Sequence, residues 1–227
     1  MPDLCQERIA SRSKYDVLQA HYCQREAGHL GRHEEFPYLQ DLALTYPAVA
    51  GKIIRDATMT TGAAWKSAEA GPNRILRWVM LQPDAVLPAY GLNMAALQPQ
   101  VVAKLREKAA SYEDCMRVAK KLTWLIYQMP DAPEVTAATQ RYLEAQFGPL
   151  TTSSTLCLVC RAPLSFSLFA QARRGKAEVE TGHSNPRVHN AVNVGFAHRE
   201  CNIAQGSKTL REFYDWIAQI LARVQPP

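Results

Sequence analysis

Apolar residues recur at helical spacing through the middle of the chain, over residues 39–148. In 98–109, and again after Ser111, they return every three or four positions, which places them on one face of a helix. Asp114, three residues after Ser111, completes a pairing that caps a helix N-terminus. A third helical segment, 133–147, stops at a glycine. We therefore expect a mainly helical region over 39–148.

The pattern changes in residues 149–227 to short strands followed by helices. Residues 177–181 alternate with the period of two that favours a strand, and 193–197 form a short apolar run. Residues 198–205 have helical character, and the glycine that follows them ends the helix. This order predicts a strand–loop–strand–helix unit.

A last helix is expected to begin at Thr209, because Glu212 completes a T-x-x-E capping box. We expect this helix to pack on the core rather than to contribute to a site. We expect Phe213, Trp216 and Ile217 to be core residues. The residues on the apolar face are Leu210, Phe213, Ile217, Ile220 and Leu221.

Residues 1–38 show neither pattern and collect cysteine and histidine among arginine, glutamine and glycine. The chain therefore divides into a candidate zinc-binding segment (1–38), a helical scaffold for DNA recognition or dimerisation (39–148) and a strand-containing module (149–227). The predicted fold class is α+β, with the helical regions ahead of the small module and its C-terminal helix.

Composition restricts the function less than these patterns do. The chain has 227 residues and a formal net charge of +5, a balance that permits a polyanionic partner without requiring one. No apolar run approaches the roughly 18 residues that a membrane span needs, and the N-terminus lacks the apolar segment of a signal peptide. We therefore expect a cytoplasmic protein with no membrane partner.

Two pairs of metal-binding residues bracket the predicted strands. Cys157 and Cys160 form C-x2-C, and His198 and Cys201 form H-x2-C. Zinc takes four such ligands in a tetrahedron, and each pair supplies two corners. Four protein ligands leave no open position for water, so this zinc ion is expected to be structural. Cys115, in a helical stretch without such neighbours, is expected to be a small buried hydrophobe.

The segment between and after these pairs carries a further signal. Glu-Thr-Gly-His183-Ser-Asn-Pro is followed by Asn193-Val-Gly-Phe-Ala-His198 and by Cys201-Asn202. This resembles the HNH (ββα-metal) endonuclease superfamily with its structural zinc, and more loosely the phage junction-resolving endonucleases. The resemblance implies that His183 is the general base, that Asn193 holds the histidine-bearing loop, and that Asn202 binds a catalytic Mg²⁺ or Mn²⁺. His198 stands where many members have cysteine.

One position departs from the pattern of this superfamily. Members usually carry Asp or His immediately before the general base as a second cation ligand, and this chain has Gly182. Residues i and i+2 of a strand share a face, so Glu180 could reach the ion from one pleat back. Alternatively Asn202 alone anchors the ion, with water and phosphate oxygens completing the shell.

The resemblance further implies hydrolysis of phosphodiester bonds in double-stranded DNA. A neutral imidazole with a pKa near 6.5 suits removal of a proton from the attacking water. His189 is expected to be a loop residue or a phosphate contact. The basic residues that flank the predicted hairpin are candidate phosphate contacts, with solvated charge as the alternative; they are Arg173, Arg174, Lys176 and Arg187.

A second basic stretch lies in residues 51–77, among small residues and a tryptophan. Its members, which include Lys52 and Arg77, could contact phosphates or form a solvated surface. The pattern favours neither reading.

A second cysteine and histidine cluster lies near the N-terminus. Cys23, His29 and His33, with two intervening glycines, resemble small zinc knuckles of the form Cys…Gly-His-x-Gly-x-His. Cys5 is the expected fourth ligand, with His21 as the alternative. Without a second zinc ion these would be surface polar residues on an irregular segment.

The leading hypothesis is a metal-dependent DNA endonuclease of the restriction type or a phage HNH nuclease, with a homodimer as a candidate assembly. A junction-resolving nuclease is the second choice. The competing class is a non-catalytic, zinc-dependent nucleic-acid-binding protein in which Gly182 marks a lost active site. An RNA-acting nuclease is the third class.

Overall fold

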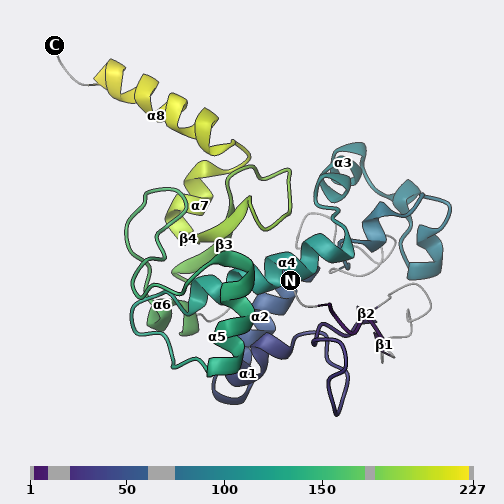
Figure 1. Cartoon of the computed structure of the whole chain (residues 1–227). Helices are drawn as coiled ribbons and strands as arrows, with labels where there is room; N and C mark the ends of the chain where they lie inside the picture. Colours follow the sequence, from purple (N-terminus) through teal and green to yellow (C-terminus); the bar gives the residue numbers. More distant parts are fainter. Residues whose placement is uncertain (1–2, 10–20, 61–74, 172–176, 225–227) are drawn as a thin grey trace.

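Figure 1 shows the computed structural model of the chain, which describes residues 3–9, 21–60, 75–171 and 177–224. The α-helices are α1 (Gln40–Thr45), α2 (Pro47–Thr58), α3 (Pro99–Glu107), α4 (Tyr112–Ile126), α5 (Ala137–Phe147), α6 (Phe166–Ala170), α7 (Arg199–Gln205) and α8 (Leu210–Val224). Short 3-10 helices are η1 (Pro37–Leu39), η3 (Val79–Leu81), η4 (Leu87–Tyr90) and η5 (Met94–Ala96). Two antiparallel pairs, β1 (Arg8–Ile9) with β2 (His21–Tyr22) and β3 (Val179–His183) with β4 (Val194–His198), complete the α+β fold.

Helix α4 is the central element, and its start follows the predicted capping pair. The Ser111 hydroxyl accepts a hydrogen bond from the backbone N–H of Asp114 at 3.0 Å. Helix α4 packs against α2, α5 and β4, so apolar residues on most of its circumference are buried. The predicted burial of Cys115 on this helix is confirmed, and burial raises the pKa of its thiol to about 12.

Two hydrophobic clusters meet at α4. One joins α1, α2, α5 and the β3–β4 hairpin, where Ile53 and Leu122 share a core with Phe196. The other joins η3, η4 and α3 to the first half of α4, through Leu105 and Met116. Because the first cluster contains residues from both sides of position 148, the helical region and the hairpin are packed as one body (Figure 1). The division of the chain into three domains stays a prediction.

The β3–β4 hairpin runs from the pair Val179↔His198 to the pair His183↔Val194. Both strands lie one or two residues later than the sequence pattern predicted, because hydrogen bonding continues to His183 and His198. Helix α7 follows β4 directly and ends at Gly206, whose φ of +59° suits glycine. The predicted strand–loop–strand–helix order is confirmed.

Helix α8 has the predicted capping box but not the predicted environment. The N–H of Thr209 donates to Glu212 Oε2 at 2.7 Å, and the N–H of Glu212 donates to Thr209 Oγ1 at 3.2 Å. Beyond its first turns, α8 projects from the body (Figure 1). Phe213 is buried, but Trp216 and Leu221 are 44% and 45% exposed. Phe213 is therefore a core residue as predicted, whereas the expectation that Trp216 lies in the core is wrong.

Within the described ranges, no helix is both long and apolar enough to span a membrane.

Candidate active site

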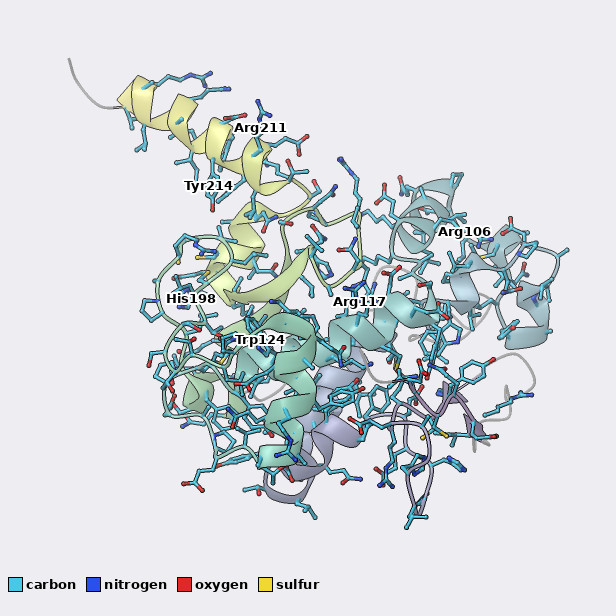
Figure 2. All side chains as sticks on the ribbon, in the orientation of Figure 1. Arg106, Arg117, Trp124, His198, Arg211 and Tyr214 are labelled. Atoms are coloured by element: carbon cyan, nitrogen blue, oxygen red, sulfur yellow. The ribbon has the colours of Figure 1, made fainter. Side chains whose placement is uncertain are left out.

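The two predicted metal-binding pairs come together at one end of the hairpin. Donor atoms of Cys157, Cys160, His198 and Cys201 all lie within 4.8 Å of one another, and Cys160 Sγ is 3.4 Å from His198 Nδ1. His198 lies on the outer side of the hairpin, away from α3 (Figure 2). Three thiols and one imidazole at this spacing form a donor set that fits tetrahedral zinc.

Backbone hydrogen bonds prepare Cys157 to act as a thiolate ligand. Burial alone would raise the pKa of this thiol. The N–H groups of Cys160, His198 and Val159 outweigh that effect and lower the pKa to about 7. An anionic sulfur within this set of donors is the form that binds zinc.

His183 is the last residue of β3, and its imidazole is the first of a pair. His183 Nε2 lies 2.9 Å from His189 Nδ1, and His189 Nε2 lies 2.7 Å from the carbonyl oxygen of Ala57. A carbonyl only accepts, so His189 Nε2 carries a proton and its Nδ1 is an acceptor. His183 Nε2 must then be the donor, which leaves a lone pair on His183 Nδ1.

Burial keeps both imidazoles neutral at pH 7. The pKa of His183 is lowered to about 4, first by burial and then by the positive charges of Arg77 and Lys108. The pKa of His189 is lowered to about 2, again chiefly by burial. A neutral His183 can accept a proton over the whole physiological range of pH.

His189 lies in the loop between β3 and β4, as predicted, but it is too buried to be an exposed phosphate contact. Its side chain is only 5% exposed, and both ring nitrogens are hydrogen-bonded within the protein. The sequence contains no direct signal for this role, because the partner carbonyl belongs to Ala57 on α2, far away along the chain.

The Asn193 side chain fastens the loop that follows His183. Its amide nitrogen donates to the carbonyl oxygens of Asn185, at 2.8 Å, and of Val188. Its amide oxygen accepts from the N–H of Asn185 at 2.7 Å and from the Ser184 hydroxyl. This one side chain therefore closes the loop between the two strands.

Asn202 and Glu180 meet beside His183. The Asn202 amide nitrogen donates to Glu180 Oε2 at 3.1 Å, which leaves the amide oxygen free of that contact. A Cβ atom added at Gly182 would lie 3.5 Å from Asn202 Oδ1 and 3.2 Å from Ala197 Cβ. Position 182 therefore faces Asn202, and the close approach of Ala197 favours glycine there.

His183, Asn202 and Glu180 line one cavity of about 300 Å³. The other residues around it are Lys52, Asp56, Arg77, Ala177 and Thr181. The structure therefore brings together the predicted base and the predicted cation ligands.

Helix α2 contributes Asp56, which the sequence did not single out, and Lys52 from the basic stretch. Asp56 accepts hydrogen bonds from Thr181 Oγ1 at 2.8 Å and from Lys52 Nζ at 2.6 Å. Arg77 lines the same cavity and is buried. The alternative of a solvated surface is therefore wrong for Arg77, and Lys52 is itself largely covered.

Of the four predicted DNA contacts beside the hairpin, only Arg187 can be placed. It lies exposed in the loop between β3 and β4. The other three, Arg173, Arg174 and Lys176, lie outside the described residues.

Comparison with known proteins identifies the family. Residues 35–201 match the model of the DraIII family. A solved structure described as "Crystal structure of a type II restriction endonuclease" is 44% identical, with 98% of each chain covered and a TM-score of 0.85. No curated protein matches the chain.

These matches place the protein in the class of nucleases. The chain belongs to the DraIII family, which is a family of restriction endonucleases.

Proposed function

We propose that the protein is a type II restriction endonuclease of the HNH (ββα-metal) type that hydrolyses double-stranded DNA with a divalent cation. The observation that carries this proposal is the shared cavity. It places a neutral imidazole with an unprotonated nitrogen, His183 Nδ1, beside the oxygen atoms of Asn202 and Glu180. The alternative of a non-catalytic binding protein gives no reason for a half-buried, neutral base at the cavity wall.

The donor set of the cavity fits a hard cation. Amide and carboxylate oxygens are the ligands that Mg²⁺ and Mn²⁺ prefer. Glu180 accepts a hydrogen bond from the Asn202 amide nitrogen. This contact orients the amide so that its oxygen is the atom available to bind a metal ion. Asn202 would therefore be a direct ligand, and Glu180 would bind the ion or one of its waters. When bound, the cation would offset the negative charge that develops on the phosphate.

His183 supplies the base for hydrolysis. Nδ1 accepts a proton from a water molecule, whose oxygen attacks the phosphorus as the bond to the 3′ oxygen breaks. The products would be a 5′-phosphate and, after the leaving oxygen takes a proton, a 3′-hydroxyl. His189 holds the imidazole in the tautomer that exposes Nδ1.

The four-ligand cluster of Cys157, Cys160, His198 and Cys201 would bind a structural zinc ion. It joins the Cys157–Cys160 turn to the junction of β4 and α7. Asn202 follows Cys201 directly, so the zinc ion would hold the ligand-bearing helix in place.

The direct test is the nicking of supercoiled plasmid with Mg²⁺ or Mn²⁺. We expect His183→Ala and Asn202→Ala to abolish nicking. Asn202→Asp should retain part of it, because a carboxylate oxygen can replace the amide oxygen. Equal zinc content and melting temperature would show that the variants are folded. DNA binding by the wild type without metal-dependent nicking would overturn the proposal in favour of a binding protein.

Parallel substrates separate the remaining alternatives. Cleavage of duplex DNA at fixed sites is expected, and the fragment ends would define the sequence. Preference for a four-way junction would indicate a resolving nuclease, and cleavage of RNA alone would indicate an RNA-acting enzyme. We also propose that the enzyme is cytoplasmic and acts as a homodimer, since a palindromic site is cut by two symmetric copies.

A further inference from the structure

The N-terminal segment holds a second cluster of metal-binding side chains, remote from the hairpin. Donor atoms of Cys5, Cys23, His29 and His33 lie within 4.8 Å of one another. Cys23 Sγ is 3.3 Å from His29 Nε2, and Cys5 Sγ is 3.4 Å from His33 Nδ1. Two sulfur and two nitrogen atoms at this spacing match the ligands of tetrahedral zinc.

The backbone brings these four residues together by specific turns. The N–H of Cys5 donates to the Arg25 carbonyl at 2.8 Å, which aligns Cys5 with the segment after β2 that carries Cys23. Gly28 and Gly31 have φ values of +75° and +89°. Side chains are disfavoured in that region of backbone space, so glycine permits the turns that return both histidines to the thiols.

His21, the alternative ligand, is engaged elsewhere. Its Nδ1 lies 2.8 Å from Glu35 Oε1, and its ring packs edge-on against Trp78 at 5.9 Å. Cys5 therefore completes the cluster instead of His21.

We propose that Cys5, Cys23, His29 and His33 bind a second zinc ion, which is structural and independent of the one beside the hairpin. Four protein ligands leave no position for water, so the ion has no catalytic role. The ion would stabilise the folded form of the loop that projects beside β1 and β2 (Figure 1). Strands of two residues do not hold such a loop alone.

The loop is anchored on the helical body through the residues next to the ligands. The Tyr142 hydroxyl donates to the Gln24 carbonyl at 3.0 Å, and Lys120 Nζ donates to Gln24 Oε1 at 3.2 Å. Tyr22 N–H donates to the Tyr112 hydroxyl at 2.9 Å. A zinc ion at Cys23 would therefore stabilise the contacts that Tyr22 and Gln24 make with α4 and α5, as well as the loop itself.

Metal analysis of the purified full-length protein tests this proposal. We expect two zinc ions per chain in the wild type, one in Cys5→Ser and in His33→Ala, and one in Cys160→Ser. The matched control is His21→Gln, which lies in the same segment and should keep both ions. His33 is exposed, so its replacement should leave the core intact.

Cobalt substitution gives a second readout. The d–d absorption of a Co²⁺ ion differs between two-sulfur and three-sulfur coordination, so His33→Ala should remove only the two-sulfur component. One zinc ion in the wild type, or two in both Cys5→Ser and His33→Ala, would overturn the proposal. Loss of an ion in His21→Gln as well would also count against this ligand set.

A separate observation concerns the cavity of the proposed nuclease. The Arg77 side chain lines it, and the residue is only 6% exposed. Its Nη1 donates to the Lys108 carbonyl at 3.0 Å, and its Nη2 donates to the Asp56 carbonyl at 3.3 Å. Among the described residues, its Nε has no hydrogen-bond partner.

In the described part of the chain, both hydrogen bonds of this buried guanidinium go to neutral carbonyls. Burial lowers its pKa to about 10, so it stays charged at pH 7. Asp56, whose charge acts on Arg77, is already hydrogen-bonded to Lys52 and Thr181. Buried charges are costly unless an opposite charge approaches, and the open side here is the cavity.

We infer that Arg77 binds a non-bridging oxygen of the scissile phosphate, a role that rests on the proposed nuclease function. Planar guanidinium donors match phosphate oxygens well. The residue would anchor the substrate from the helical region, opposite the hairpin that carries His183.

Sulfate serves as a probe that needs no catalysis. It should raise the melting temperature of the wild type and of Arg117→Met, an exposed arginine on α4 (Figure 2). It should not raise that of Arg77→Met. Plasmid nicking should fall at least tenfold in Arg77→Met and be partly kept in Arg77→Lys.

Sulfate stabilisation and nicking that are both unchanged in Arg77→Met would overturn the role of Arg77. If the wild type does not nick DNA, the proposed function fails, and the sulfate shift still reports on the anion site.

Discussion

At the scale of single residues, the site depends on a chain of three hydrogen-bonded groups. This chain determines which ring nitrogen of His183 carries the proton. The carbonyl of Ala57 determines the tautomer of His189, and His189 determines that of His183. Outer partners of this kind orient an imidazole and set which nitrogen is free. The sequence resemblance predicted His183 as the base. Its hydrogen-bond partner is His189, which the loop position had suggested to be exposed.

Replacement of His189 should impair catalysis without removing the base. In His189→Leu, His183 Nε2–H loses its acceptor, so the ring can turn or change tautomer. We expect kcat for nicking to fall by about 10- to 100-fold with little change in KM. His189→Gln should recover part of the rate, because its amide oxygen can accept the same hydrogen bond. Equal rates in both variants and the wild type would rule out the positioning role.

The same two histidines predict how stability depends on pH. Both have a folded pKa, about 4 and about 2, below the value of roughly 6.5 expected after unfolding. Below pH 6.5 the unfolded chain therefore binds more protons, and the free energy of unfolding falls as the pH decreases toward 4. Above pH 6.5 this contribution is fully present.

Urea denaturation at pH 7.5, 5.5 and 4.5, in buffer without Mg²⁺, measures this effect. The matched reference is the His183→Gln/His189→Leu double variant, in which the zinc ligands still titrate as in the wild type. We expect the wild type to lose roughly 2–3 kcal/mol per histidine more than the double variant between pH 7.5 and 4.5. Parallel losses in the two proteins would contradict the assignment of buried, neutral imidazoles.

At the scale of elements, the site is a hairpin and a helix held together at both ends. The cysteine and histidine cluster joins β4 to the Cys157–Cys160 turn. At the other end, the buried Gln205 of α7 donates to the His183 carbonyl at 2.8 Å. This geometry keeps His183 and Asn202 on one cavity although they belong to different elements.

Loss of the cluster should therefore disable the site without touching its reactive groups. We expect Cys160→Ser to lower the zinc content by one ion, to lower the melting temperature by several degrees and to abolish nicking. Ser167→Ala, remote from the cluster, serves as the control. Full nicking by a Cys160→Ser protein that lacks this ion would show that the cluster is dispensable.

The hairpin, α4 and α7 could be predicted because their signals are local. The Ser111–Asp114 cap, the alternation of β3 and the paired metal ligands each lie within a few positions of one another. Asp56 on helix α2 was not predicted as part of the site, since it and Thr181 are 125 positions apart. In the sequence, Lys52 and Asp56 have the i,i+4 spacing of an ordinary surface pair.

At the scale of the whole molecule, α8 is the element whose prediction failed. Its apolar face was expected to complete the core, because amphipathic helices usually bury that face. Only the first part does so: Phe213 joins the main cluster, and the Tyr214 hydroxyl donates to the Val159 carbonyl near the base of the helix (Figure 2). The remainder leaves Leu221 and Val224 exposed. Leu221 and Val224 are three positions apart and so share one side of the helix, and exposed apolar residues grouped in this way are typical of an interaction surface.

The proposed homodimer would use this face of α8. We expect light scattering to show a dimer for the wild type and a monomer for Leu221→Glu/Val224→Glu, because buried carboxylates would oppose the contact. The control is Leu44→Glu, a change at an exposed leucine on α1. Plasmid cleavage gives an independent readout, since a dimer cuts both strands and yields linear DNA whereas a monomer yields open circles. A double variant that stays dimeric and still linearises plasmid would place the subunit contact elsewhere on the molecule.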